Sequence, residues 1–496
     1  MNNSRMRGIS KGKKSIGANA VLNVSRQCLS FVFPLITYPY ALHTLGVESI
    51  GKVNYAGSIV SYFSLIAALG VSTYAIREGA KIRDDKEKLN KFVSEIFTVN
   101  LLSTAVAYIL LISCLVLVDH FESYRLLIFL SSLSIILTTL GVDWINNIFE
   151  DFLIITIRSI LSHVLLLILL FVFVHEPSDY YAYALLTVSG NALTCVMNLF
   201  YCRKYVRLRI TRRPNIRVHM VPLLVLFANY LAISIYTNSD TTMLGWFKGD
   251  YYVGLYAVSV KIYGIVKGLL TAIYNVAIPR LATNSMAEGH KEYRKLTTDL
   301  WAYLSLLIIP CSAGLICVAP EILYIFGGSE YVEAVTSLRL LAVALCFAIF
   351  GGLVTVCMNV TLGREKENLK ATLIAALLNF GLNFIAIPLF AQDGAAATTI
   401  IAEIFVFAFC FIRLPNKGEY LEGKTVCKSV IHSLAGSVCM LVFAFFIRGY
   451  FTSYLSRLAV IVIGCIVIYT VVLALLRDTY LFSAILFVSG KIRRKS

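Results

Sequence analysis

Fourteen long runs of apolar residues divide the sequence, and short polar segments separate them. An α-helix needs about 20 apolar residues to cross a membrane, and each run approaches or exceeds that length. The pattern therefore predicts fourteen transmembrane helices. The runs lie at residues 20–42, 55–75, 92–118, 125–142, 153–174, 180–201, 219–247, 253–278, 299–319, 335–360, 368–390, 394–414, 429–449 and 457–476.

Composition agrees with a chain solvated largely by lipid. Hydrophobic residues make up 58% of the 496 residues and charged residues only 15%. A soluble domain has roughly 45–50% apolar and about 25% charged residues. A soluble chain of this composition could not cover its apolar surface, so we expect an all-α membrane protein.

The polar segments alternate in charge along the chain. If the N-terminus lies in the cytoplasm, cytoplasmic segments hold 35 of the 44 lysine and arginine residues and outer segments hold 5. The other four lie within helices. Cytoplasmic loops of membrane proteins are enriched in these residues, so both termini are predicted to be cytoplasmic. The first run, from Val21 to Leu42, is too long for a signal peptide and is interpreted as a retained anchor.

An internal repeat accounts for most of the chain. Ile50-Gly51 and Val253-Gly254 open two of the helices at an offset of 203 residues, and the same offset carries Arg77 onto Arg280. Both halves begin on the same side of the membrane, which indicates a parallel repeat about an axis along the membrane normal. The predicted units are a six-helix lobe at 1–218, a second six-helix lobe at 219–414, and a helix pair with a basic interfacial tail at 415–496.

Ionisable residues within the spans are the candidates for function. A charge at bilayer depth costs a few kcal/mol, so it usually faces the bundle interior or a water-filled cavity. Arg26, Lys261, Lys267, Asp240 and Glu403 all lie inside predicted helices. These charges are mostly basic, and a cavity lined by them would favour an anionic cargo such as a lipid diphosphate. For Arg26 the alternative is a side chain that reaches the inner headgroups.

Two of these residues lie at similar depth on consecutive helices. Asp240 and Lys261 are each about 10–12 Å from the outer ends of their helices, at 1.5 Å per residue. An Asp240–Lys261 ion pair is therefore expected. Lys267 lies about 120° around its helix from Lys261, so the two lysines need not line one face.

No enzyme, metal or cofactor motif is present in the sequence. The twelve cysteines form no Cys-x-x-Cys, the seven histidines no His-x-x-x-His, and there is no phosphate-binding glycine loop. The cysteines are interpreted as small apolar residues between helices. Glu321, Glu330 and Glu333 share one outer loop, where a solvated loop is favoured over a catalytic group.

A local signature links the chain to a known group. It comprises Gly141-Val142-Asp143-Trp144, Glu150-Asp151-Phe152, Ile155-Thr156-Ile157-Arg158, Val253-Gly254-Leu255-Tyr256 and Ile325-Phe326-Gly327 followed by Tyr331. With fourteen helices in two halves and a final pair, the chain resembles the lipid-linked O-antigen and capsule repeat-unit flippases. Their superfamily also holds the multidrug and toxin extrusion transporters.

The resemblance implies a V-shaped bundle of two lobes in the bacterial inner membrane. Such a protein would move an undecaprenyl-diphosphate-linked oligosaccharide between leaflets by alternating access, through a basic central cavity. The cavity candidates in this chain are Arg26, Lys261 and Lys267, with Asp240 as partner. Polysaccharide polymerase and chain-length proteins are the implied partners.

Two further roles and two further functions stay open at this point. Arg77 and Arg280 could attract the headgroup at the inner mouth or serve only as topology anchors, and Asp240 and Glu403 could couple transport to an ion. A cation-coupled multidrug exporter would need such acidic residues, and here bases outnumber them. A membrane polysaccharide polymerase or ligase would need a large outer loop, and the sequence has none.

Overall fold

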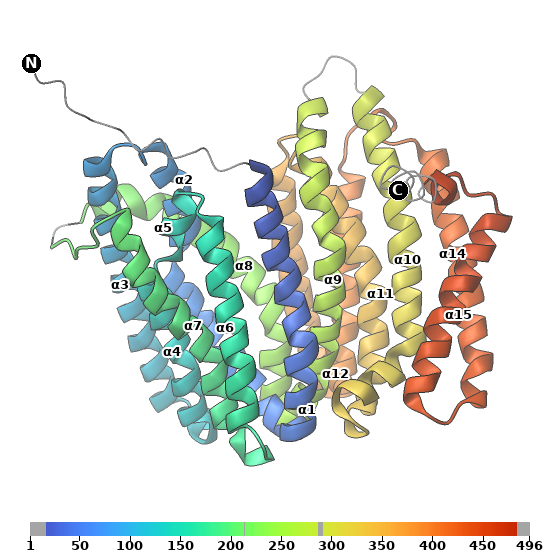
Figure 1. The fold of residues 1–496 in the computed structure, drawn as a ribbon, viewed down its shortest axis with the longest axis horizontal. Coiled ribbons are helices and arrows are strands. Elements are labelled where there is room, and N and C mark those ends of the chain that lie inside the picture. Colours follow the sequence, from blue (N-terminus) through green and yellow to red (C-terminus); the bar gives the residue numbers. More distant parts are fainter. Residues whose placement is uncertain (1–15, 213, 286–290, 484–496) are drawn as a thin grey trace, which may run out of the picture.

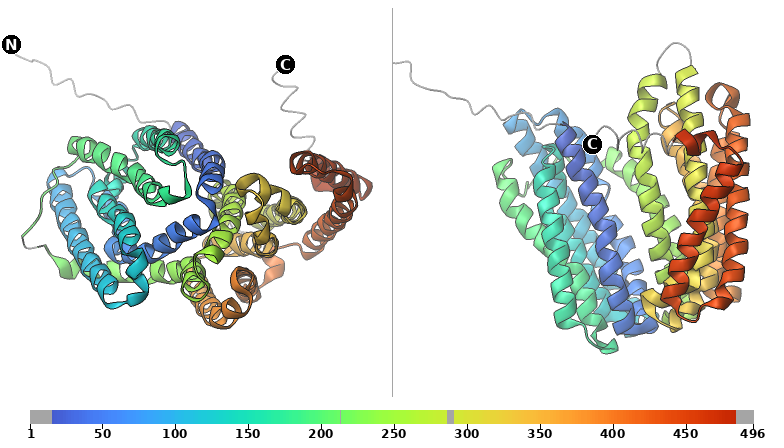
Figure 2. Two further views of the ribbon diagram at one scale, coloured as in Figure 1. Left: turned by 90° about the horizontal axis from the view of Figure 1, so that it is seen from below. Right: turned by 45° about the vertical axis from the view of Figure 1, so that its right-hand side comes forward.

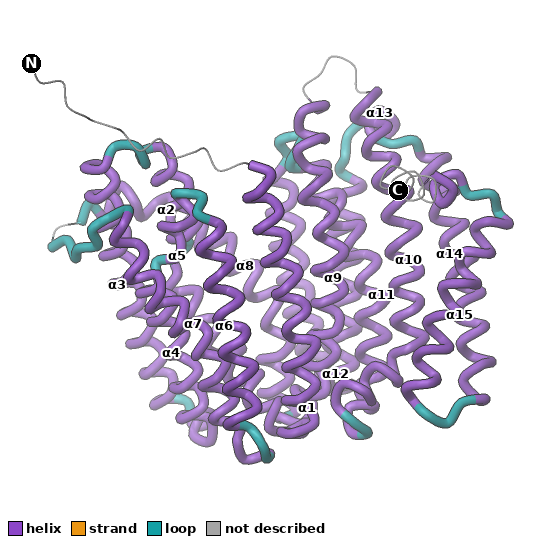
Figure 3. The backbone as a smooth tube through the Cα atoms, viewed as in Figure 1, coloured by secondary structure: helices purple, strands orange, loops and turns teal. Residues whose placement is uncertain are grey.

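Helices make up the fold of the chain, in a computed structural model that describes residues 16–212, 214–285 and 291–483 (Figure 1). Figure 3 shows loops mainly at the two ends of the bundle. The helices are α1 (Ile16–Ala68), α2 (Val71–Lys81), α3 (Lys86–Leu117), α4 (Arg125–Gly141), α5 (Asp143–Ile148), α6 (Phe152–Phe173), α7 (Tyr180–Tyr201), α8 (Ile216–Lys248), α9 (Asp250–Ser285), α10 (Lys291–Gly327), α11 (Val335–Gly352), α12 (Glu365–Ile412), α13 (Lys417–Tyr420), α14 (Gly423–Ile447) and α15 (Tyr454–Leu475). A π-helical segment, Leu353–Asn359, continues α11.

Twelve helices of the described chain are long and apolar enough to cross a membrane. Two of them, α1 with 53 residues and α12 with 48, are too long to be single spans. A straight helix of 53 residues would measure about 80 Å, against about 40–45 Å for a whole bilayer. Gly46 in α1 and Ala391 in α12 have non-helical backbone angles, with φ of 75° and 48°. The prediction of an all-α membrane protein is confirmed, and fourteen spans result if each long helix is divided at that residue.

The chain reverses direction at the break in α1. Figure 1 shows α1 starting at the upper end of the bundle and α2 lying at that same end. The 53 residues of α1 therefore run to the lower end and back. We call this end, where the described chain also finishes, the terminal end; the other is the hairpin end. In α12, a Cβ on Gly394 would lie 2.2 Å from the Ala386 carbonyl oxygen, because the chain folds back tightly there.

A reciprocal contact at the hairpin end relates the two halves. A Cβ added to Gly51 would lie 1.8 Å from the carbonyl oxygen of Asp250, and one added to Gly254 would lie 2.0 Å from that of Val47. Val47 and Asp250 are themselves 203 residues apart, as are the two glycines. Exchange of equivalent partners is what a two-fold axis produces. The contact therefore supports the repeat predicted from the sequence.

Two groups of helices diverge from this contact. In Figure 2, right, the helices α1–α7 and the helices α9–α15 lie closer together at the hairpin end than at the terminal end. Large apolar side chains are exposed on the outer faces, including Leu117 on α3, Phe173 on α6, Phe445 on α14 and Leu455 on α15. An apolar perimeter of this kind is expected where lipid, rather than water, is the solvent.

Helix α8 contacts both groups. Near its start, the ring nitrogens of His219 are hydrogen-bonded to Glu95 of α3 (3.0 Å) and to Tyr74 of α2 (2.9 Å). Near its end, Asp240 bonds to α9 and α12. The boundary expected at residue 218 stays a prediction, because α8 packs on both groups: Thr242, near its end, also bonds to Ser58 of α1.

The final helix pair is fastened by a buried carboxylate. Glu321, on α10, is fully buried, and its oxygens lie 3.2 Å from Arg448 and 3.5 Å from Arg457, which flank the hairpin between α14 and α15. The interpretation of Glu321 as part of a solvated loop was wrong, because α10 continues to Gly327 and carries this residue inward. Glu330 and Glu333 are exposed.

Candidate functional site

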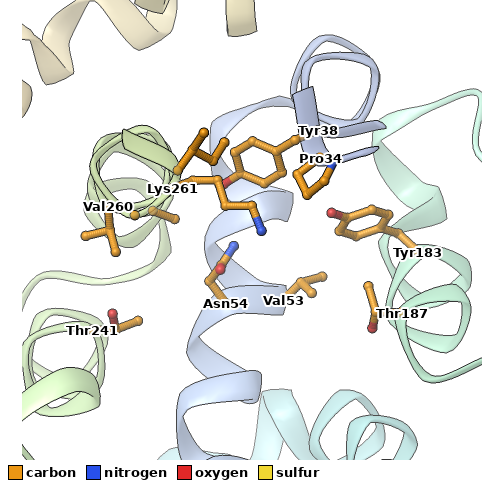
Figure 4. A pocket seen from close by; sticks show the side chains of 12 residues that line it. Pro34, Tyr38, Val53, Asn54, Tyr183, Thr187, Thr241, Val260 and Lys261 are labelled. Carbon is orange, nitrogen blue, oxygen red and sulfur yellow. The ribbon is translucent and has the colours of Figure 1, made fainter. Parts of the chain in front are cut away.

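A cavity of about 490 Å³ lies between the two groups of helices. Both halves of α1 contribute to it, together with α7, α8 and α9 (Figure 4). Its lining residues are Pro34, Tyr38, Val53, Asn54, Tyr183, Thr187, Thr241, Ala257, Val260, Lys261, Gly264 and Ile265.

Helix periodicity explains which residues of α9 reach this cavity. Ala257, Val260, Lys261, Gly264 and Ile265 recur at intervals of three and four residues, which places them on one face of the helix. The neighbouring residues Val258 and Ile262 are buried in the core on the opposite side. Gly264 has nothing within 4 Å of its missing Cβ, so the face is open there.

Among the described residues that line the cavity, Lys261 is the one cation. Figure 4 shows its amino group near Asn54 and Tyr38, with Tyr183 pointing toward it from α7. The ammonium lies 5.5 Å from the centre of the Tyr38 ring. Within the described chain no carboxylate lies within 4.0 Å of it. Lys261 thus presents an uncompensated positive charge beside aromatic rings, hydroxyls and an amide.

The expected Asp240–Lys261 ion pair is not formed. Asp240 is buried and accepts hydrogen bonds from Tyr256 (2.8 Å), Asn383 (2.7 Å) and Thr399 (2.9 Å). Successive residues of a helix point about 100° apart, and Thr241 is the residue of α8 that faces the cavity. Asp240 therefore points toward α9 and α12, away from Lys261.

A second buried cluster surrounds Lys267. Its ammonium lies 2.9 Å from Glu403 of α12 and 3.0 Å from the hydroxyl of Tyr263, one turn earlier on α9. The Tyr263 hydroxyl is also 3.3 Å from Glu403. Lys267 therefore lies among the helices of the second half rather than in the cavity, as its rotation of about 120° from Lys261 allows.

The remaining candidates lie apart from these clusters. Arg26 lies on the first half of α1, but its side chain falls outside the described residues. Arg77, on α2, is exposed and lies 2.8 Å from Glu78, while Arg280, on α9, is exposed near the terminal end. The structure brings Asp240, Lys267 and Glu403 together among α8, α9 and α12, and leaves Lys261 in the cavity.

The signature stretch of the sequence folds into a polar cluster near the terminal end, in which Arg158 and Asn198 are buried and Asp143 is half exposed. Arg158 lies 3.1 Å from Asp143 and also donates to Asn198 of α7. Asn198 in turn accepts from Asn146 (2.8 Å) and donates to the Gly141 carbonyl (2.8 Å). These contacts tie α5 to α6 and α7, and none of these residues lines the cavity.

Several cavity residues were not singled out from the sequence. Tyr38, Asn54, Tyr183 and Thr187 line it, yet polar residues at such positions are common between membrane helices. The only available signal was general: tyrosine is frequent, with 28 residues, and suits sugar hydroxyls. The pairing of Lys267 with Glu403, 136 residues away, had no local signal.

Comparison with known proteins adds a family and a fold. Residues 16–285 match the family described as polysaccharide biosynthesis protein. A "Putative O-antigen transporter" of Escherichia coli (strain K12) is 23% identical over 406 residues, covering 82% of this chain and 98% of that protein. A "Probable flippase AglR" of Haloferax volcanii is 25% identical, covering 84% of this chain and 86% of that protein.

The fold is similar to that of solved transporters. The structure titled "Lipid II flippase MurJ, inward closed conformation" aligns with a TM-score of 0.73 at 15% identity, covering 93% of this chain and 99% of that one. An outward-facing multidrug resistance transporter of the MATE family aligns with a TM-score of 0.53 at 17% identity, covering 80% and 95%. At these identities the likeness concerns the fold alone.

Proposed function

The chain belongs to the polysaccharide biosynthesis protein family, and from that premise we propose that it is a flippase for lipid-linked oligosaccharides. Its cargo would be an undecaprenyl-diphosphate-linked repeat unit of the O-antigen or capsule type. The protein would carry this cargo across the bacterial inner membrane by alternating access. The observation that carries this proposal is the unpaired Lys261 in a cavity between the two halves of the fold, beside Tyr38, Asn54 and Tyr183.

The charge of Lys261 suits a diphosphate. Elsewhere in the described spans Lys267 is neutralised by Glu403, whereas Lys261 lies beside the Tyr38 ring with no carboxylate as an ion-pair partner among the described residues. An uncompensated cation in a partly desolvated cavity attracts an anion, and phosphate oxygens accept charge-assisted hydrogen bonds from an ammonium. The hydroxyls of Tyr38, Tyr183 and Thr187 would then contact the sugars.

The orientation of the protein follows from its loop charges. The terminal end carries most of the lysine and arginine residues, so it is assigned to the cytoplasm. The two helix groups are further apart at this end, so the cavity would receive cargo from the inner leaflet. Arg26, Arg77 and Arg280 lie toward the same end and would attract the diphosphate before it reaches Lys261.

Asp240 and Glu403 are the proposed coupling residues. Both carboxylates are buried, and together they connect α8, α9 and both halves of α12. Protonation or cation binding would change the charge of such a buried group and hence the packing of these helices. A cation-coupled multidrug exporter could use the same carboxylates, and drug resistance on expression would distinguish it from a flippase.

Replacement of Lys261 tests the proposed function. In a host whose own flippase is deleted, the Lys261→Ala variant should restore much less surface polysaccharide than the wild type. Lipid-linked repeat units should accumulate on the inner leaflet, and Lys261→Arg should restore part of the transport. Lys370→Ala, which removes an exposed lysine paired with Glu367, is the matched control and should behave as the wild type.

Two results would contradict the proposal. Full polymer levels with Lys261→Ala, at equal protein abundance, would remove Lys261 from the transport path. Resistance to dyes and cationic drugs on expression, without complementation of any flippase deletion, would instead favour the multidrug exporter. Polysaccharide polymerase and chain-length proteins are the proposed partners, because they would receive the translocated repeat unit.

A further inference from the structure

A second hollow, of about 430 Å³, lies on the first half of the fold near the terminal end. It is formed by the beginning of α3 and by the segment 207–211 that leads toward α8. Its lining residues are Asn90, Lys91, Ser94, Arg207, Arg209, Ile210 and Thr211. It shares no residue with the central cavity.

Two backbone hydrogen bonds fix the segment against α3. The N–H of Arg207 donates to the side chain of Asn90 (2.8 Å), and the N–H of Thr211 donates to the hydroxyl of Thr98 (2.9 Å). Along this stretch the side chains alternate: Val206 is buried and Leu208 packs on the core, whereas Arg207 and Arg209 are exposed. The two guanidinium groups are therefore presented together by an ordered segment.

The charge of this hollow is not balanced by nearby carboxylates. Lys91, Arg207 and Arg209 line it, and none of its lining residues is acidic. Within the described chain none of the three has an ion-pair partner. Several other cations at the terminal end do have one: Arg77 and Lys81 with Glu78, Arg83 with Glu150, Lys88 with Asp85, and Lys370 and Arg413 with Glu367. Three free cations around one hollow, with the Ser94 and Thr211 hydroxyls beside them, suit a phosphate group.

The position of the hollow indicates a ligand that belongs to the bilayer. Figures 1 and 2 both show the segment before α8 at the outer edge of the first helix group, on the side remote from α9. Ile210 lines the hollow and is 70% exposed, and Val218 and Val221 on the first turns of α8 are also exposed. Cations beside an apolar, outward-facing surface match the headgroup and upper acyl chain of a phospholipid.

We propose that this hollow is a binding site for an anionic phospholipid of the inner leaflet, which contacts Lys91, Arg207 and Arg209 through its phosphate. The bound lipid would hold the segment 207–211 on α3 and so fix the start of α8, the helix that contacts both halves of the fold. The site is separate from the transport cavity, so the proposal does not depend on the identity of the cargo.

Lipid retention by the purified protein tests the site. The full chain would be placed in nanodiscs of phosphatidylcholine with a minor share of phosphatidylglycerol, and the co-purifying lipid would be counted by native mass spectrometry. The variant Lys91→Gln/Arg207→Gln/Arg209→Gln should retain less phosphatidylglycerol by on the order of tenfold or more. Each basic residue near an anionic membrane surface strengthens binding several-fold, and the variant removes three of them. The control Lys81→Gln/Lys88→Gln/Lys370→Gln removes equal charge from paired positions and should retain it.

Competition with inorganic phosphate distinguishes a bound phospholipid from a free phosphate ion at this site. If a lipid occupies the site, added phosphate should leave bound phosphatidylglycerol largely in place, because the acyl chains remain in the bilayer. Displacement by phosphate alone, or equal loss from both triple variants, would overturn the proposal. The anchoring bonds of Arg207 and Thr211 use backbone N–H groups, so the substitutions leave them intact, and an unchanged melting temperature in phosphatidylcholine alone would verify folding.

Discussion

The two halves of the fold share a repeat but place their buried polar groups differently. In the second half, Asp240, Lys267 and Glu403 lie within the spans and join α8, α9 and α12. In the first half, the polar cluster of Arg158, Asp143 and Asn198 lies near the terminal end and ties α5 to its neighbours. Charges at membrane depth are costly and are usually kept for function, whereas a cluster near the interface stabilises structure at less cost. The comparison is consistent with the proposed ion coupling in the second half and with a structural role for the cluster in the first.

The largest expected effect follows from breaking the ion pair in the second half. Glu403→Leu would leave Lys267 as an uncompensated charge, and removal of one partner from a buried pair costs about 3–5 kcal/mol. We expect the lower end of that range, because a third of the Lys267 side chain is exposed. The free energy of unfolding in detergent would measure the loss.

A double substitution sharpens this prediction. Lys267→Met/Glu403→Leu removes both charges, and an apolar pair of similar volume should restore most of the stability. Transport should stay low if Glu403 takes part in coupling. The exposed pair Lys370–Glu367 is the control, since breaking it should change stability by less than about 1 kcal/mol. Recovery of transport together with stability would reduce Glu403 to a packing role.

The next effect concerns the contact that relates the halves. Gly51→Ala or Gly254→Ala would place a methyl carbon about 2 Å from a backbone oxygen, as the Gly51–Asp250 and Gly254–Val47 approaches show. Backbone cannot yield as a flexible side chain can, so the helices must separate at the hairpin end, at a cost of about 1–3 kcal/mol. Hydrogen–deuterium exchange should increase at residues 47–55 and 250–258. Gly57→Ala, with open space around its Cβ, should leave both segments unchanged.

The repeat and the spans could be predicted because their signals are local. Hydropathy marks each span in about 20 consecutive residues, and the offset of 203 residues is readable from matched positions such as Gly51 and Gly254. The breaks within α1 and α12 do not disturb that reading, because each separates two apolar runs.

Side-chain partners within the spans could not be predicted from depth alone. Asp240 and Lys261 lie at equal depth, yet the rotation of α8 and α9 turns one toward α12 and the other into the cavity. Rotation depends on packing against helices far away in sequence, such as the contact of Lys267 with Glu403. Glu321 was misread for the same reason, because its partners Arg448 and Arg457 come from the final hairpin.

The smallest change in structure comes from one substitution made in each half. Tyr256→Phe removes the hydroxyl that donates to Asp240 in the second half, and Tyr74→Phe removes the hydroxyl bonded to His219 in the first. Both tyrosines are buried, and the same atom is lost from each. Loss of a hydrogen bond to a charged group costs about 1.5–3 kcal/mol and loss of a neutral one about 1 kcal/mol, so both proteins should fold.

Transport, normalised to the amount of folded protein, should separate the two variants. Tyr256→Phe removes one hydrogen bond to Asp240, a proposed coupling carboxylate. The transport rate of this variant should therefore fall several-fold, and its dependence on the driving ion should shift. Tyr74→Phe changes only the attachment of α8 to α2, so its normalised rate should match the wild type within about twofold. Equal losses from both substitutions would mean that the two halves contribute alike to transport, because a hydroxyl far from the carboxylates would then matter as much as one bonded to Asp240.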